Sequence, residues 1–179
     1  NIQEYTDKAV FDTLPRATVN IGSKVDFPRN NVEKCGNIIA VSNNRDIAIQ
    51  AAEDAVSNIF ITLEPDVKET WDFLNYKEQD DEKDFPPSAF CKLTAEQLDK
   101  IQNDIPQNEK VINYIPEVLK NNELSKLKTW NHNTINQTIL KFDILRPKHP
   151  ALDAKKFWSA LLRGGVQGAV YYSDSCESK

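Results

Sequence analysis

The sequence lacks most of the residues that build phosphate-binding and metal-binding sites. It has five glycines, two histidines and no methionine in 179 residues. Phosphate-binding loops need clustered glycines, because their backbone must approach phosphate oxygens closely and often takes positive φ values. Neither GxGxxG nor GxxxxGK(S/T) is present, and His132 and His149 show no HExxH spacing. We therefore predict no nucleotide-binding loop, no metal site and no catalytic residue in this chain.

The three cysteines are too few and too far apart for a disulfide framework. Cys35, Cys91 and Cys176 are odd in number and form no CxxC pair. We interpret them as free thiols of a protein from the reducing cytoplasm. A hydrolase that pairs a cysteine with a histidine is a distant alternative, because no local signature such as GxSxG supports it.

The sequence also has no long apolar run and no basic cluster. A membrane-spanning helix requires ~20 apolar residues in succession, and no such stretch occurs. The net charge is −5, from 22 basic and 27 acidic residues, so the surface would repel a phosphate backbone. Hydrophobic residues, at 40%, suffice for a core. These values predict a globular protein whose partners include neither nucleic acid nor membrane. Because the chain does not start with methionine, we also expect a fragment or a processed product.

The first third of the chain combines helical and extended patterns. Residues 1–17 show helical spacing, which Pro15 would end. Apolar residues at alternate positions of 18–27 predict a strand, and a polar turn follows over 28–31. The continuous apolar run of 35–41 predicts a second strand that is buried on both faces.

The most clearly predicted helix of the chain follows this second strand. Asn44 is a favourable N-cap residue, and Asp46 lies in the first turn, where a negative charge is stabilising. Apolar residues, several of them alanine, recur at 3–4 spacing as far as Ile59. Small alanines allow such a helix to lie close to a sheet. Residues 59–63 are then predicted as a third strand, which ends before Pro65.

A charged segment separates this part from the second half. Residues 67–74 predict a short helix. Residues 77–84 consist almost entirely of charged side chains, and Pro86 and Pro87 follow them. This composition is typical of a linker or a solvated surface loop.

The second half is predicted to be mainly helical. Thr94 and Gln97 form a capping-box pattern, Pro116 suits the first helical position, and Asp153 suits an N-cap. Gly164 and Gly165 would end the helix that begins at Asp153. The predicted helices span 94–103, 116–127, 134–142 and 153–163, and a terminal strand spans 169–172.

These patterns assign the chain to the α+β class. Residues 1–75 form a lobe with a small sheet and an alanine-rich covering helix, in the order β-turn-β-α-β. Residues 76–87 form a charged, proline-containing linker or loop. Residues 88–179 form a mainly helical module that ends in the predicted strand.

One stretch of the first lobe resembles part of a known enzyme family. It runs from Phe27-Pro-Arg-Asn-Asn into the strand Gly36-Asn-Ile-Ile-Ala-Val41, and then through Arg45-Asp46 into the alanine-rich helix. This succession resembles the C-terminal lobe of ATP-grasp carboxylate ligases, of which biotin carboxylases and phosphoribosylglycinamide synthetases are examples. The resemblance covers residues 18–66, about a quarter of the chain.

The resemblance implies an accessory role rather than a catalytic one. The family's glycine-rich loop, nucleotide-contacting residues and metal ligands would belong to an ATP-grasp core upstream in the same parent chain. This chain would hold no cofactor itself, whereas Mg-ATP would bind the parent enzyme. It would pack beside the active site or support a homodimer, and it would be inactive alone. The alternative is a self-standing interaction module without enzymatic activity.

Three basic residues are candidates for contact with a substrate or another anion. If the resemblance holds, Arg29 and Lys34 lie in the turn region that would face the catalytic core. Arg163 opens the cluster Arg163-Gly-Gly-Val-Gln-Gly168, whose exposed amides could hold an anion. The alternatives are ordinary surface charge for Arg29 and Lys34, and a helix end followed by a tight turn for the glycine cluster.

Overall fold

A computed structural model describes residues 10–26, 30, 32–75, 86–90, 95–105, 115–120, 126–149 and 151–177. The chain divides into two compact units, Asn1–Ile59 and Phe60–Lys179. The first holds two strands and one helix, and the second is helical, which confirms the α+β class. No helix among the described residues is both long and apolar enough to cross a membrane.

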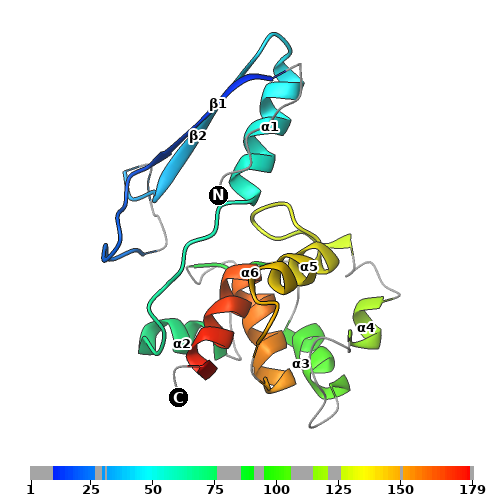
Figure 1. Cartoon of the computed structure of the whole chain (residues 1–179). Helices are drawn as coiled ribbons and strands as arrows, with labels where there is room; N and C mark the ends of the chain where they lie inside the picture. Colours follow the sequence, from blue (N-terminus) through cyan, green and yellow to red (C-terminus); the bar gives the residue numbers. More distant parts are fainter. Residues whose placement is uncertain are drawn as a thin grey trace. The chain divides into compact units, whose positions relative to one another are not determined.

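The first unit is a two-stranded antiparallel sheet with one helix on it (Figure 1). Strand β1 (Val10–Ala17) pairs with β2 (Gly36–Ser42), and the register places Leu14 opposite Ile39. A bulge interrupts the pairing between Val10 and Asp12. Helix α1 (Arg45–Ser57) runs back along the sheet and packs mainly on β2.

Helix α1 begins where its sequence predicts. The Asn44 side chain accepts hydrogen bonds from the backbone N–H groups of Asp46 (2.9 Å) and Ile47 (3.3 Å), which confirms the N-cap. Ala51 and Ala55 are buried, and their small side chains allow the close approach of helix and sheet. The helix ends at Asn58, whose N–H donates to the carbonyl of Ala55 (3.2 Å).

Strand β2 is confirmed, but its predicted burial on both faces is wrong. Ile39 is 52% exposed and Val41 is 45% exposed, whereas Ile38 and Ala40 between them are half-buried. Helix α1 covers only the face of Ile38 and Ala40. The run of apolar residues therefore reflects one buried face and one open apolar face, not a strand in the interior of a larger sheet.

The helix predicted to continue through residues 10–17 is wrong, because these residues form β1. Pro15 is compatible with the strand because it lies opposite Ile38 in a pair that exchanges no hydrogen bonds, so its missing N–H is not needed. The strand predicted over 18–27 is also wrong. The described residues 18–26 form an irregular loop with a turn at Gly22 (φ 83°), and Ile21 is fully exposed.

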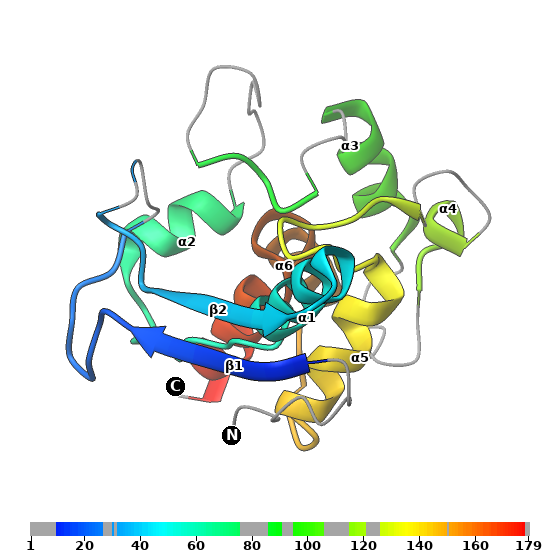
Figure 2. The ribbon, with the colours of Figure 1, turned by 90° about the horizontal axis from the view of Figure 1, so that it is seen from above.

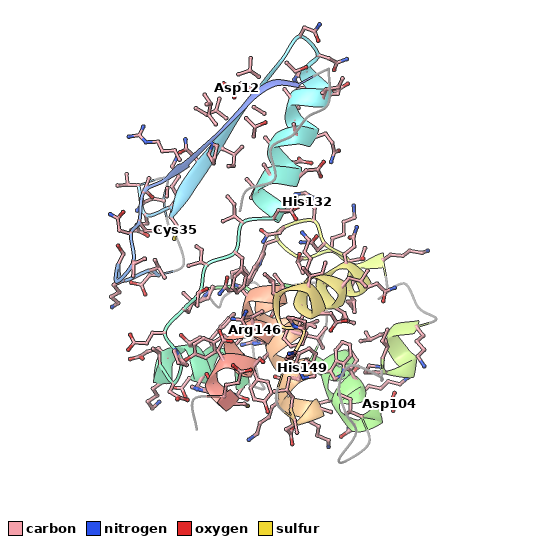
Figure 3. All side chains as sticks on the ribbon, in the orientation of Figure 1. Asp12, Cys35, Asp104, His132, Arg146 and His149 are labelled. Atoms are coloured by element: carbon pink, nitrogen blue, oxygen red, sulfur yellow. The ribbon has the colours of Figure 1, made fainter. Side chains whose placement is uncertain are left out.

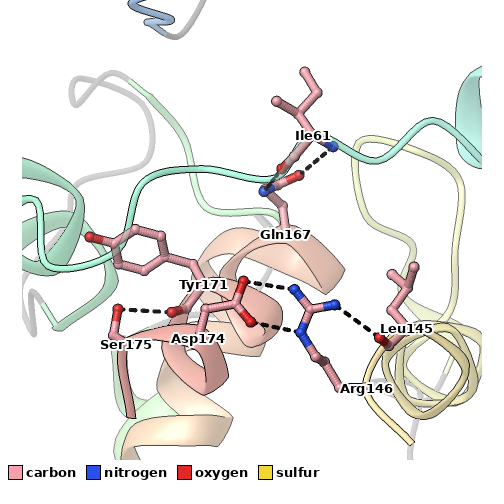
Figure 4. Close-up of polar contacts among 7 residues, drawn as sticks. All are labelled: Ile61, Leu145, Arg146, Gln167, Tyr171, Asp174 and Ser175. Carbon is pink, nitrogen blue, oxygen red and sulfur yellow. Dashed lines mark hydrogen bonds and ion pairs between the residues drawn. The ribbon is translucent and has the colours of Figure 1, made fainter. Parts of the chain in front are cut away.

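The third strand predicted over residues 59–63 does not form. These residues have no regular secondary structure and pair with no strand in the described part of the chain. Instead, the side-chain amide of Gln167 bonds both backbone groups of Ile61 (Figure 4): its Oε1 accepts from the N–H (3.3 Å), and its Nε2 donates to the carbonyl. A side chain of the second unit therefore supplies what a neighbouring strand would have supplied.

The second unit is built around helix α6 (Ala154–Glu177). Helices α2 (Lys68–Asn75), α3 (Ala95–Asp104) and α5 (Ile135–Leu145) pack on it, and the short α4 (Glu117–Lys120) packs on α3 (Figures 1 and 2). The buried side chains that join these helices are mostly large and apolar, and include Leu74, Phe90, Ile101, Phe142, Phe157, Trp158, Leu161 and Tyr171.

Several predicted helix starts in this unit are confirmed. Thr134 caps α5 in a complete capping box with Gln137, and the Asp153 carboxylate accepts from the N–H of Lys156 (2.9 Å) at the start of α6. Helix α4 follows Pro116 directly, but residues 126–127 are not α-helical. The predicted capping residue Thr94 lies outside the described residues, as do positions 121–125.

The terminal strand predicted at residues 169–172 is wrong, because these residues are helical and buried. Gly165 does interrupt α6, with φ 61° and ψ −148°, but a helix resumes beyond it. A Cβ at Gly168 would lie 2.2 Å from the Ala160 carbonyl oxygen, so the two parts of α6 touch there. The helix that begins after Asp153 therefore ends at the glycine pair, as predicted, and a second helix follows directly within α6.

The division between the two units falls earlier than the linker predicted at residues 76–87. Residues 60–75, including α2, belong with the helical unit because Leu74 and Trp71 pack on its core. Of the predicted linker, residues 76–85 lie outside the described residues, while Pro86 and Pro87 are half-buried.

Gly168→Ala is expected to destabilise the second unit. Because the new methyl group would overlap a backbone oxygen that cannot rotate away, we expect a loss of about 2 to 3 kcal/mol in the free energy of unfolding. Urea unfolding followed by circular dichroism measures it. Gly164→Ala is the matched control, since its Cβ meets only the flexible end of Leu74 (2.9 Å). Equal losses in both variants would contradict the close contact at Gly168.

Candidate functional site

Lys34 lies in a loop that local hydrogen bonds hold in place just before β2. The Asn30 side chain accepts from the N–H groups of Val32 (2.8 Å) and Glu33 (3.3 Å), and the Thr18 hydroxyl donates to the Lys34 carbonyl. These bonds fix the backbone, and the Lys34 side chain remains exposed. Contact of Lys34 with a substrate or another anion stays a prediction. Arg29 lies outside the described residues.

Arg163 lies inside the helical unit and is 3% exposed. Its Nε donates to the carbonyl of Phe73 (3.1 Å), and its Nη1 donates to the Ser88 hydroxyl (2.9 Å). The guanidinium also lies 5.0 Å from the centre of the Phe73 ring. The Arg163 carbonyl accepts from the N–H of Ala89 (2.7 Å). Arg163 thus joins the end of α2 and the segment 86–90 to α6.

This surrounding favours the structural alternative for Arg163. Its guanidinium is directed toward protein groups, and the turn around Gly164 and Gly165 is buried. The glycines of the cluster lie at the break between the two parts of α6, and Gly168 is buried as well. A role of Arg163 in anion contact stays a prediction that the described geometry does not favour.

A partly buried ion pair joins the end of α5 to α6. Two parallel bonds connect the Arg146 guanidinium to the Asp174 carboxylate, Nε–Oδ1 at 2.6 Å and Nη2–Oδ2 at 2.7 Å (Figure 4). Nη1 donates to the Leu145 carbonyl (2.9 Å). The hydrogen bond to Asp174 raises the pKa of Arg146. Such a bidentate pair fixes geometry as well as charge, so it positions α5 on α6.

Tyr172 is a buried phenol at the same junction. Its oxygen accepts from the N–H of Asp153 (3.2 Å), which links the loop before α6 to the far part of that helix. Burial, and next a hydrogen bond with Cys176, raise the pKa of Tyr172 well above its ordinary value. The phenol is therefore a neutral structural group and not a base.

The histidines and cysteines of the described region do not form a site. His132 and His149 flank α5 at its two ends, where Figure 3 labels them. The His149 ring lies beside the Phe142 ring in a tilted arrangement, with ring centres 5.6 Å apart and an angle of 40° between the planes. Cys35 and Cys176 are free thiols, as predicted. Within the described ranges, no group of three or more histidine, cysteine, aspartate or glutamate residues could hold a metal ion. Cys91 lies outside these ranges.

One family of known proteins matches part of the first unit and a few residues beyond it. Residues 16–64 match the family described as L-amino acid ligase C-terminal domain 2. No curated protein and no solved structure gives a significant match. The match supports the C-terminal region of an ATP-grasp-related ligase, but not the particular likeness to biotin carboxylases and phosphoribosylglycinamide synthetases. It covers about a quarter of the chain, from the last two residues of β1 through β2 and α1 to Glu64.

Arg163→Met is expected to destabilise the helical unit, whereas Lys34→Met is expected to leave stability unchanged. Methionine keeps much of the volume of arginine but leaves the Phe73 carbonyl and Ser88 hydroxyl without these donors. We expect the free energy of unfolding to fall by about 2 to 4 kcal/mol. Differential scanning calorimetry of both variants measures the effect. Equal melting temperatures for Arg163→Met and the parent sequence would contradict the structural role.

Tyr172 is expected to make the protein less stable in alkali. Its pKa is raised in the folded state, so the unfolded chain loses the phenol proton first, at about its ordinary value of 10.0. Above that pH the unfolded state binds fewer protons, and the free energy of unfolding falls as pH rises. Urea unfolding between pH 8 and 11 should show a weaker decline in Tyr172→Phe. The same slope in both proteins would contradict the assignment.

Proposed function

We propose that this chain is a non-catalytic C-terminal part of an ATP-dependent ligase that acts on L-amino acids. The observation that carries the proposal is the match of residues 16–64 to the L-amino acid ligase C-terminal domain 2. The matched segment is the one that resembles the C-terminal lobe of ATP-grasp ligases by its strand, polar turn and alanine-rich helix. In this proposal, the upstream ATP-grasp core of the same polypeptide binds Mg-ATP and carries out the ligation.

The described residues support an accessory role in two ways. The buried side chains of Arg163 and Tyr172, and the partly buried pair of Arg146 and Asp174, bond to groups of neighbouring segments and hold helices together. The three glycines of α6 are buried at the break between its two parts, which favours a structural role for them. The proposed domain therefore contributes a surface to the ligase, beside the active site or between subunits.

The proposal predicts no nucleotide site in the 179-residue chain. A one-site ligand at a hundredfold excess over its dissociation constant stabilises a protein by about 3 kcal/mol. We expect no change in melting temperature with millimolar Mg-ATP, with or without a mixture of L-amino acids. We also expect no release of ADP. Amino-acid-dependent ADP release by the purified chain would overturn the non-catalytic role.

The proposal also predicts a longer natural polypeptide. An antibody raised against the 20.4-kDa chain should detect a substantially larger protein in extracts of the source cells. The immunoprecipitated protein should release ADP when Mg-ATP and L-amino acids are supplied together. A natural product of 20.4 kDa alone would contradict the ligase assignment and favour the interaction module.

A further inference from the structure

The outer edge of β2 has main-chain groups that pair with nothing among the described residues. Thr18 and Cys35 continue the antiparallel register of β1 and β2, and the Thr18 N–H donates to the Cys35 carbonyl (2.9 Å). This bond shows which residue pairs of the two strands exchange hydrogen bonds. Because such pairs alternate along the strands, Ile39 and Val41 bond to β1. The N–H and C=O groups of Ile38 and Ala40 therefore point away from β1.

The outer edge of β1 is protected, whereas the outer edge of β2 is not. Pro15 has no N–H to offer on the outer side of β1, and a bulge and two charged residues, Asp12 and Arg16, interrupt it further. Prolines, bulges and charges are the devices by which proteins prevent strand addition. Residues 36–42 contain no proline, charge or bulge. The sequence thus leaves one particular edge open.

Helix α1 places apolar side chains on the same side as this open edge. Ile49, Ala52 and Val56 form a row at 3–4 spacing on α1 next to the buried alanines, and Ile59 follows just after the helix ends. Ile49, Val56 and Ile59 are 40%, 43% and 41% exposed. Helix α1 packs on the face of Ile38 and Ala40 and runs antiparallel to β2. In a right-handed helix with this direction, the row lies above the outer edge of β2, on the side away from β1.

We propose that one extended, uncharged strand from the rest of the ligase polypeptide pairs with the outer edge of β2, beside the apolar row of α1. The proposal rests on the proposed function, because it requires a longer chain. Main-chain bonds to Ile38 and Ala40 would give affinity, and apolar residues at alternate positions would pack against the row on α1. A charged strand would place its charges against apolar groups without a partner.

A second copy of this chain fits the edge less well. If β2 paired with β2 of another molecule around a two-fold axis, both α1 helices would lie on the same face of the joined sheet. Each packs mainly on its own β2 and faces the shared edge, and helices need 8–10 Å between their axes. Strands are only about 4.8 Å apart. The edge therefore accommodates a strand without a covering helix of its own.

Amide hydrogen exchange, resolved to single residues, tests this proposal. The amides of Ile38 and Ala40 should exchange fast in the 179-residue chain, and roughly a hundredfold more slowly in the full-length ligase. The inward amides of Ile39 and Val41 act as the internal reference, because they already bond to β1. Fast exchange of Ile38 and Ala40 in both proteins would overturn the proposal and leave the proposed function intact.

Other occupants give different results. Protection in the 179-residue chain that rises with protein concentration would show a second copy. Protection that does not depend on concentration would show a segment of this same chain. Either result overturns the proposal. If the source cells contain no longer polypeptide, the proposed function and this inference both fail. The immunoblot of cell extracts detects that outcome independently of hydrogen exchange.

A pair of proline variants provides an independent measurement. Ala40→Pro removes an outward N–H from the edge of β2, and Ala17→Pro removes one from the edge of β1. In the 179-residue chain the two changes should have similar effects on melting temperature. In the full-length ligase, Ala40→Pro should cause the larger loss of melting temperature. Equal losses in the full-length enzyme would overturn the proposal.

Discussion

The close contact of helix α6 with itself is the constraint on which the helical unit depends. Gly165 supplies a conformation with positive φ, and Gly168 lets the backbone approach the Ala160 carbonyl. With this bend, α6 can present buried side chains to α2, α3 and α5 at once. Arg163, at the bend, donates hydrogen bonds to the Phe73 carbonyl and the Ser88 hydroxyl, which belong to two neighbouring segments. Arg146 with Asp174, and Tyr172 with the Asp153 amide, then hold the adjoining loops against the same helix.

The first unit follows a different principle, because few of its described side chains are buried. Two strands and one helix bury Ala51 and Ala55, while Leu14, Ile39 and Val41 remain about half exposed. A two-stranded sheet is marginally stable in water without further packing. An accessory domain of a larger enzyme can have such a composition, since the rest of the enzyme supplies the missing contacts. The family match of residues 16–64 falls largely on this unit.

Local signals predicted those elements whose ends are determined by nearby side chains. Asn44 before α1, Thr134 before α5 and Asp153 before α6 each bond an N–H two or three residues ahead, so the cap can be recognised in the sequence. Predictions failed where a short apolar run fits either a strand or a buried helix. Residues 169–172 are the clearest case: α6 is covered on all sides there, so no polar face marks its helical period. Pro15 was similarly interpreted as a helix end. The sequence does not show which positions of a strand donate their N–H to the neighbouring strand, and therefore where a proline is tolerated.

The sequence by itself determined the α+β class, strand β2, the start of α1, the free thiols and the lack of a glycine-rich phosphate loop. These features depend on composition or on contacts within a few residues. It also singled out Lys34 and Arg163 by charge and by neighbouring glycines. Only the tertiary structure decided that Arg163 is a buried link to segments 75 to 90 residues away in sequence, that Gln167 replaces a strand partner for Ile61, and that one face of β2 stays open. The physical reason is that burial and hydrogen-bond partners of these groups come from distant parts of the chain, which no local pattern specifies.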